Sequence, residues 1–164
     1  MIFNGYPKGM VLATSLVTIL TTNAYAHSGE THSSQTYDPV NTEFGTYDPS
    51  YSSQRTVDVS MNDNMRFEPQ SIEVTAGEVV HFRIRNDGSL LHEFVLGTNK
   101  SLHQHADMMR TFPQMEHDEP YMAHVPAGEV VDIVWKFDKA GELGFACLLP
   151  GHYEAGMKGK LSVR

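Results

Sequence analysis

The sequence predicts an all-β protein, a β-sandwich or barrel, and three observations lead to this class. Apolar residues recur at every second position in several runs, which is the pattern of strands with one buried face. Turn pairs such as Asp87-Gly88, Ala140-Gly141 and Pro150-Gly151 separate these runs, at intervals of roughly ten residues. The length of 164 residues is that of one domain of ordinary size.

The first 26 residues have the features of an export signal. Lys8 is the only charged residue before the apolar run of residues 11–20, and Ala24-Tyr25-Ala26 has the small-x-small pattern that signal peptidases cleave. A membrane anchor is the alternative, but a bilayer core needs about 20 apolar residues. We therefore expect a cleaved signal peptide (1–26), a mature chain that begins at His27, and a periplasmic location.

Residues 27–54 form a polar N-terminal tail in this interpretation. The tail is rich in Ser, Thr, Asp, Pro and Tyr, and it repeats Thr-Tyr-Asp-Pro at 36–39 and 46–49. Such a composition offers little apolar area to offset the entropy of ordering. The expected tail is loose or draped over the domain, which would span residues 55–164.

The strands of that domain are predicted from alternation along the chain after Arg55. The residues expected on buried faces are Val57, Val59 and Met61; Val80, Phe82 and Ile84; His92, Phe94 and Leu96; Val131, Ile133, Trp135 and Phe137; and Leu161 and Val163.

One segment, about 97–124, breaks the alternation and has the character of an insertion. Its residues 103–124 contain four histidines and four methionines, a marked enrichment over the rest of the chain. His105, Met108 and Met109 would share one face if the segment is helical. Soft thioethers select Cu(I) and imidazole binds both oxidation states. The candidate secondary copper ligands are His103, His105, Met108, Met109, Met115, His117, Met122 and His124, together with His27 at the expected mature N-terminus. The alternative is a solvated loop whose methionines pack on the sandwich.

Charge and cysteine content narrow the function classes. The net charge of −8 argues against nucleic acid and anionic membrane surfaces as partners. Cys147 is the only cysteine, and in an exported protein an unpaired thiol is intermolecular, reactive or held by a metal.

Cys147, His152 and Met157 lie on one turn-rich stretch and could face a common point. Zinc sites favour several thiolates or carboxylates, whereas copper accepts thiolate, imidazole and thioether in a trigonal His₂Cys site with a weak axial Met. The second histidine required is best supplied by His92, at the start of a strand. The alternatives are that the three residues serve packing and loop structure, or that Cys147 and His152 form a nucleophile pair, which explains neither Met157 nor the lack of an evident orienting acid.

The spacing Cys147-x4-His152-x4-Met157, with Pro-Gly before the histidine and Lys-Gly after the methionine, resembles the copper loop of azurin- and auracyanin-type cupredoxins. The stretch Leu90-Leu91-His92-Glu93-Phe94 resembles their upstream ligand segment. The resemblance implies a Greek-key β-sandwich with one type 1 copper for one-electron transfer. Two departures stand out: many relatives have Asn where this chain has Glu93, and their compact core lacks the Met/His insertion. With export, the insertion makes the chain similar to periplasmic copper-tolerance cupredoxins of the CopI kind.

The function expected is copper tolerance, with type 1 copper bound by His92, Cys147, His152 and Met157, further copper in the insertion, and cuprous oxidase activity as one possible form of the role. A simple electron carrier, steered by its negative charge to a redox partner with a basic surface, is the first alternative. A non-redox copper chaperone or store is the second, and a pure adhesion sandwich the last.

Overall fold

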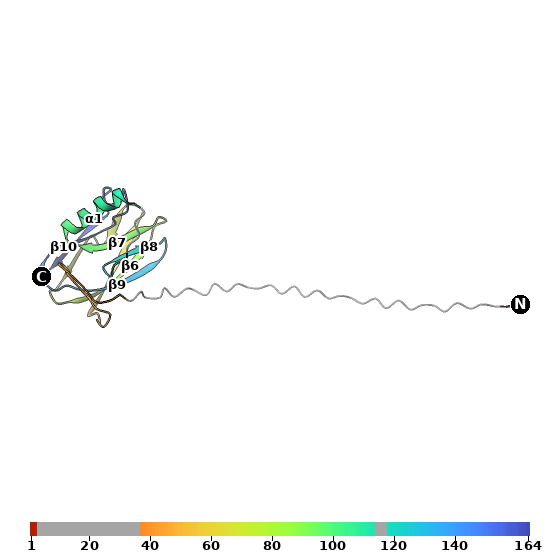
Figure 1. The fold of residues 1–164 in the computed structure, drawn as a ribbon, viewed down its shortest axis with the longest axis horizontal. Coiled ribbons are helices and arrows are strands. Elements are labelled where there is room, and N and C mark those ends of the chain that lie inside the picture. Colours follow the sequence, from red (N-terminus) through yellow and green to blue (C-terminus); the bar gives the residue numbers. More distant parts are fainter. Residues whose placement is uncertain (3–36, 114–117) are drawn as a thin grey trace. The chain divides into compact units, whose positions relative to one another are not determined.

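The computed structural model describes residues 1–2, 37–113 and 118–164. The chain divides after Ser33, and every feature below belongs to the unit Ser34–Arg164. The signal peptide expected over residues 1–26 is almost entirely outside the described residues, and His27 is outside them too. The unit Ser34–Arg164 is built from two β-sheets (Figure 1), which confirms the predicted all-β class.

The first sheet has six strands in the order β1-β2-β9-β6-β3-β4. These strands span Val40–Thr42 (β1), Gly45–Tyr47 (β2), Val130–Lys136 (β9), Val79–Asn86 (β6), Arg55–Asn62 (β3) and Arg66–Glu68 (β4). β3 and β6 are parallel with Val59 opposite Ile84, and β6 and β9 are antiparallel with Phe82 opposite Ile133. The predicted alternation places these apolar side chains on the inner face.

The second sheet has five strands in the order β5-β11-β10-β7-β8. These strands span Ser71–Val74 (β5), Lys158–Val163 (β11), Gly141–Ala146 (β10), His92–Gly97 (β7) and Met122–Val125 (β8). The chain crosses between the sheets repeatedly, as a Greek-key sandwich requires. β7 and β10 are neighbours, with Phe145 opposite Leu96, so the residues that begin β7 and follow β10 meet at one end of this sheet.

The main core lies between the sheets and is rich in aromatic side chains. Phe67 packs edge-on against Phe94 and Phe145, and Phe94 stacks on Phe145 with ring centroids 5.4 Å apart. Cys147 and Met157 belong to this same buried cluster. The candidate ligands therefore lie on the wall of a packed core, which restricts their movement.

The N-terminal end of the sandwich differs from expectation. Residues 40–47, which the sequence places in a polar tail, form the hairpin β1–β2, and β2 pairs with β9. Phe44, at the hairpin turn, is buried and stacks on Trp135 at 5.4 Å. Phe44 and the partly buried Tyr47 pack this otherwise polar segment against the core, and the sandwich begins before the predicted boundary at residue 55.

The expected insertion contains one described helix, α1 (Asn99–Thr111), and the strand β8. Thr98 caps the helix by accepting a hydrogen bond from the Ser101 amide at 3.1 Å. The helix packs on β7 and β10 on the face away from the main core (Figure 1). There it completes a second apolar cluster, composed of Val95, Leu102, Ala106, Met109, Met122, Ala146 and Leu148. In the described part of the chain no helix is long and apolar enough to cross a membrane.

Candidate metal centre

The loop that joins β10 to β11 brings three of the predicted ligands together through its own backbone. The amide of Cys147 donates to the carbonyl of Met157, and the amide of Met157 donates to the carbonyl of His152, each at 3.0 Å. Gly151 and Gly156 adopt positive φ values of 88° and 95°, which a residue with a Cβ adopts only with strain. The loop is therefore a closed, hydrogen-bonded turn system.

His92 approaches this loop from the adjacent strand β7, where it is the first residue. Its Nδ1 atom lies 3.3 Å from Nδ1 of His152, and Nδ1 of His152 lies 3.3 Å from Sγ of Cys147. In the described part of the chain these three residues are the one group of His, Cys, Asp and Glu side chains whose ligand atoms converge, all within 4.8 Å. His92 and Cys147 are fully buried, and His152 is partly exposed.

Met157, the fourth predicted ligand, lies on the same loop as Cys147 and His152. Its side chain is fully buried in the main core, and its backbone is bonded to Cys147. The four predicted type 1 residues thus lie at one end of the second sheet, three on the loop and one on β7.

The Cys147 thiol is held in its neutral form when no cation is near. Burial raises the pKa of Cys147 from 9.0 to about 12, although the backbone amides of Glu93 and Leu149 act in the opposite direction. Burial also lowers the pKa of His152, assisted by the neighbouring His92. Neutral imidazoles have lone pairs for a metal, and a bound cation favours the thiolate.

Glu93, which stands where many relatives have Asn, makes two hydrogen bonds at the site. Its amide donates to Sγ of Cys147 at 3.3 Å, and its Oε2 accepts from the amide of Leu148 at 3.1 Å. The side chain is fully buried. Glu93 therefore ties β7 to the first two residues of the loop, Cys147 and Leu148.

Asp63 is a contact of the site that the sequence did not reveal. It follows β3, and its Oδ1 atom lies 3.2 Å from Nε2 of His92. Hydrogen bonds from backbone amides, chiefly that of Ser89, lower the pKa of Asp63, so the group is a carboxylate at neutral pH. No periodicity or local motif links residue 63 to residue 92, because the contact depends on how two loops meet.

The described histidines and methionines of the insertion have separate surroundings. Met109 and Met122 are buried in the second apolar cluster, whereas Met108 is 41% exposed. His103 is exposed, with Nδ1 3.1 Å from the hydroxyl of Tyr153, and His105 is half-buried. Met109 and Met122 therefore pack on the sandwich, as the alternative interpretation of the segment expects.

Three further candidates have other surroundings. His124 is exposed on β8, and its Nε2 lies 3.6 Å from Oε1 of Glu93. Met115 and His117 lie outside the described residues, as does His27. The assignment of secondary copper ligands therefore stays a prediction.

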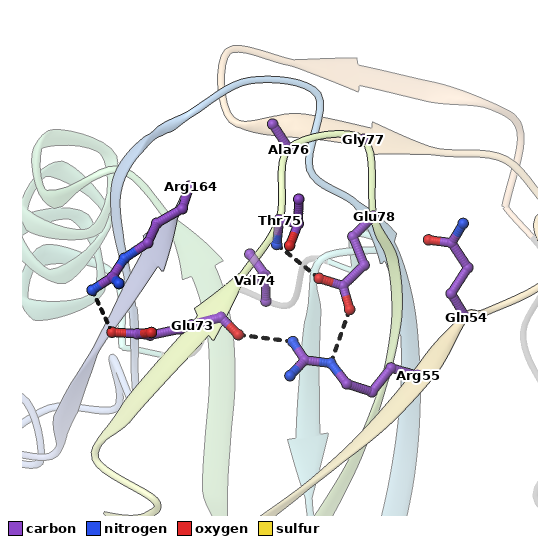
Figure 2. A pocket seen from close by; sticks show the side chains of 9 residues that line it. All are labelled: Gln54, Arg55, Glu73, Val74, Thr75, Ala76, Gly77, Glu78 and Arg164. Atoms are coloured by element: carbon purple, nitrogen blue, oxygen red, sulfur yellow. Dashed lines mark hydrogen bonds and ion pairs between the residues drawn. The ribbon is translucent and has the colours of Figure 1, made fainter.

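An open cleft at another part of the molecule is lined by charged residues that pair with one another. Figure 2 shows Arg55 between Glu73 and Glu78, with its Nε 2.9 Å from Oε1 of Glu78. Arg164 pairs with Glu73 at 2.6 Å. None of the four predicted type 1 residues lines this cleft. Its ion pairs link neighbouring segments of the sandwich to one another.

The sandwich and its converging nitrogen and sulfur atoms define the protein class. The chain belongs to the plastocyanin/azurin family of copper-binding proteins, whose family model matches residues 53–164. Within that family it is similar over 158 residues to the copper-resistant cuproprotein CopI of Rubrivivax gelatinosus, with 44% identity and 96% of each chain covered. CopI of Pseudomonas aeruginosa is 36% identical over 139 residues, covering 67% of this chain and 76% of that protein.

Solved structures agree with the fold. Auracyanin B superposes with a TM-score of 0.62 at 23% identity, covering 74% of this chain and 95% of its own. An azurin from Methylomonas sp. strain J gives 0.57 at 18% identity, covering 68% and 99%. The predicted cupredoxin-like sandwich is confirmed, and copper is the cofactor of the family.

The donor set in this chain fits that cofactor. The Nδ1 atoms of two imidazoles and one sulfur atom lie close together. Their lone pairs could all be donated to one metal cation. A buried thioether residue is bonded to the same loop. Zinc would favour further thiolates or carboxylates, so this set matches copper.

Proposed function

We propose that this chain is an exported, periplasmic type 1 copper protein that serves copper tolerance. The single observation that carries the proposal is the convergence of His92, Cys147 and His152, with ligand atoms within 4.8 Å. The similarity to CopI proteins over almost the full length supports the tolerance role. Residues 1–26 would serve export, and the copper domain would comprise residues 55–164 together with the hairpin β1–β2, which belongs to the same sheet.

The four residues would divide the work of the site. Cys147 would hold the copper as a thiolate with the strongest bond, and His92 and His152 would hold it through imidazole nitrogens. Met157 would contribute a weakly bound thioether that tunes the reduction potential. Bound copper supplies one-electron chemistry, because it alternates between Cu(II) and Cu(I).

The packed surroundings of these residues suit electron transfer. The loop is closed by its own hydrogen bonds, and His92 and Cys147 are fully buried. A site that cannot rearrange freely changes little between oxidation states, which keeps the reorganisation cost small.

Cuprous ion is the substrate we assign to this role. In the enzymatic form of the proposal, cuprous ion would be oxidised to Cu(II) by loss of one electron, which dioxygen or a redox partner protein would accept, and copper held by His92, Cys147, His152 and Met157 would supply the one-electron chemistry. Histidines and methionines of residues 103–124 and His27 would collect cuprous ion, with the exposed His103 and Met108 as its first described contacts.

A copper titration tests the site. Purified protein without residues 1–26 receives Cu(II), and visible absorption and bound copper per chain are measured together. We expect an intense thiolate charge-transfer band that saturates at one copper and is followed by further tightly bound copper, and we expect loss of the band in C147S and H92Q; saturation of bound copper at one per chain would favour the simple electron carrier. H81Q is the matched control, since His81 contacts Asp132 on an outer sheet face; it should keep the band. A colourless wild-type protein would overturn the proposal.

A simple electron carrier is the second candidate. Leu90 and Leu91, which directly precede His92, are 48% and 45% exposed and offer an apolar contact surface. The net charge of −8 would steer a basic partner. A simple carrier would bind one copper, and deleting its gene would leave the copper tolerance of the cells unchanged. Under the leading proposal, cells without the gene should be more sensitive to copper. A non-redox chaperone or store would bind copper without a reversible one-electron wave.

A further inference from the structure

Asp63 occupies a rigid position between two loops at the end of the sandwich. It is the first residue after β3, in a turn closed by a hydrogen bond of 3.0 Å from the Met65 amide to the Asn62 carbonyl. The facing loop is tied to the same strand, because the Asp87 amide donates to the Met61 carbonyl at 2.8 Å. The two backbones are thus fixed relative to each other before any side chain is considered.

The carboxylate of Asp63 adds further bonds across this junction. It accepts from the amide of Ser89 at 2.8 Å and from the amide of Leu90 at 3.2 Å. Gly88 is required by the approach, because a Cβ at this position would collide with the carboxylate. With two amides on it, the carboxylate has a defined orientation even though its side chain is 38% exposed.

The remaining lone pairs of this carboxylate face the imidazole of His92. Oδ1 lies 3.2 Å from Nε2, and the imidazole is fully buried. An ionised carboxylate can only accept hydrogen bonds, so Nε2 carries the proton. In the neutral ring Nδ1 is then the bare nitrogen, and Nδ1 is the atom that faces His152.

We propose that Asp63 is the positioning residue of His92: its carboxylate fixes the ring and its tautomer, and its negative charge stabilises the cupric form of the centre. The inference deepens the proposed function and rests on it for the role of the charge. Carboxylates on the outer nitrogen of a metal-binding histidine orient the ring and raise its basicity. Nothing in the local sequence around Asp63 suggests such a role.

The charge has a measurable consequence. A negative charge near the centre favours Cu(II) over Cu(I), and solvent weakens this effect because the group is partly exposed. We expect loss of the charge to change the ratio of the two copper affinities by roughly three- to tenfold, which is about 30 to 60 mV in the potential of a one-electron couple.

Three variants separate the two parts of the proposal. D63N keeps an acceptor oxygen and removes the charge, and D63A removes both. D87N is the matched control, because it also removes one negative charge. Asp87 lies on the same loop as Ser89 but pairs with Arg85 and not with His92. The reduction potential of each copper-loaded protein is measured by voltammetry. The tautomer of His92 is measured in the metal-free protein by ¹⁵N NMR of the imidazole.

The expected result is a higher potential in D63N than in D87N and wild type, and an Nε2–H tautomer in wild type that is lost in D63A. A potential in D63N equal to that of D87N would overturn the charge role. An unchanged tautomer in D63A would overturn the positioning role. The NMR result does not require copper, so failure of wild type to bind copper would reject the proposed function without deciding the role of Asp63 in orienting His92.

Discussion

The Cys147 thiol gives the metal-free protein a pH dependence of stability that can be calculated. Burial raises the pKa of Cys147 from 9.0 to about 12 in the folded protein. A raised pKa means that the folded state holds the proton more tightly than the unfolded chain does. The resulting stabilisation is complete below pH 9 and decreases as the pH rises toward 12.

The magnitude follows from the size of the shift. Each unit by which the pH exceeds the unfolded pKa costs about 1.4 kcal/mol of unfolding free energy for one group. Between pH 7.5 and pH 10.5 the Cys147 contribution should therefore fall by about 2 kcal/mol. Tyr37, Tyr121 and Tyr153 also have raised pKa values, so the effect of Cys147 must be isolated by a variant.

C147S provides the comparison, because serine does not titrate in this range. Urea unfolding of both metal-free proteins is measured with chelator and reductant at pH 7.5, 9 and 10.5. We expect the free energy of wild type to fall about 2 kcal/mol further than that of C147S over this interval. Parallel curves would refute the reasoning, since they would mean that the folded thiol is no harder to ionise than the unfolded one.

Three other predictions concern separate parts of the molecule. M109A should cost about 2–5 kcal/mol of stability and leave bound copper unchanged, whereas M108A should change stability by less than about 0.5 kcal/mol; loss of copper without loss of stability in M109A would reverse this assignment. G45A should destabilise by about 1–3 kcal/mol, because Gly45 has a φ of 148° and a Cβ there would collide with the Trp135 indole, while G141A has open space and serves as control in the same unfolding assay. E93Q should keep the thiolate charge-transfer band, because the amide oxygen of Gln can accept the hydrogen bond from Leu148 that Oε2 of Glu93 accepts, whereas E93A should lower the free energy of unfolding by about 1–3 kcal/mol, because it leaves that buried amide without an acceptor; equal unfolding free energies for the two variants would contradict this role.

The strands were largely predictable because alternation is a local signal. Val80, Phe82 and Ile84 lie on the inner face of β6 as expected, and His92 begins β7. The hairpin β1–β2 was not predictable, because its order depends on Phe44 finding Trp135, about 90 residues away along the chain. Alternation predicts which face of a single strand is buried, but it does not predict which distant residue packs against it.

The candidate site likewise has residues that the sequence predicts and one contact that it does not. Cys147, His152 and Met157 follow from spacing on one loop, and the structure brings the predicted His92 to them across neighbouring strands. Asp63 could not be found, because its contact with the site depends on the approach of two loops. The donor types of Met109 and Met122 suggested copper, but burial against β7 and β10 decided their place in the fold.

Helix α1 has a consequence for the dielectric environment of the centre. Strand β7 is buried along its whole length, and residues 93 and 95 point away from the main core toward the side that the helix covers. Leu102, Ala106 and Met109 exclude water from that side. Charges in a water-poor region act over longer distances than charges in solvent. The insertion therefore has a structural consequence besides its proposed copper ligands: helix α1 keeps water from the face of β7 on which Val95 lies, along the strand that begins with His92.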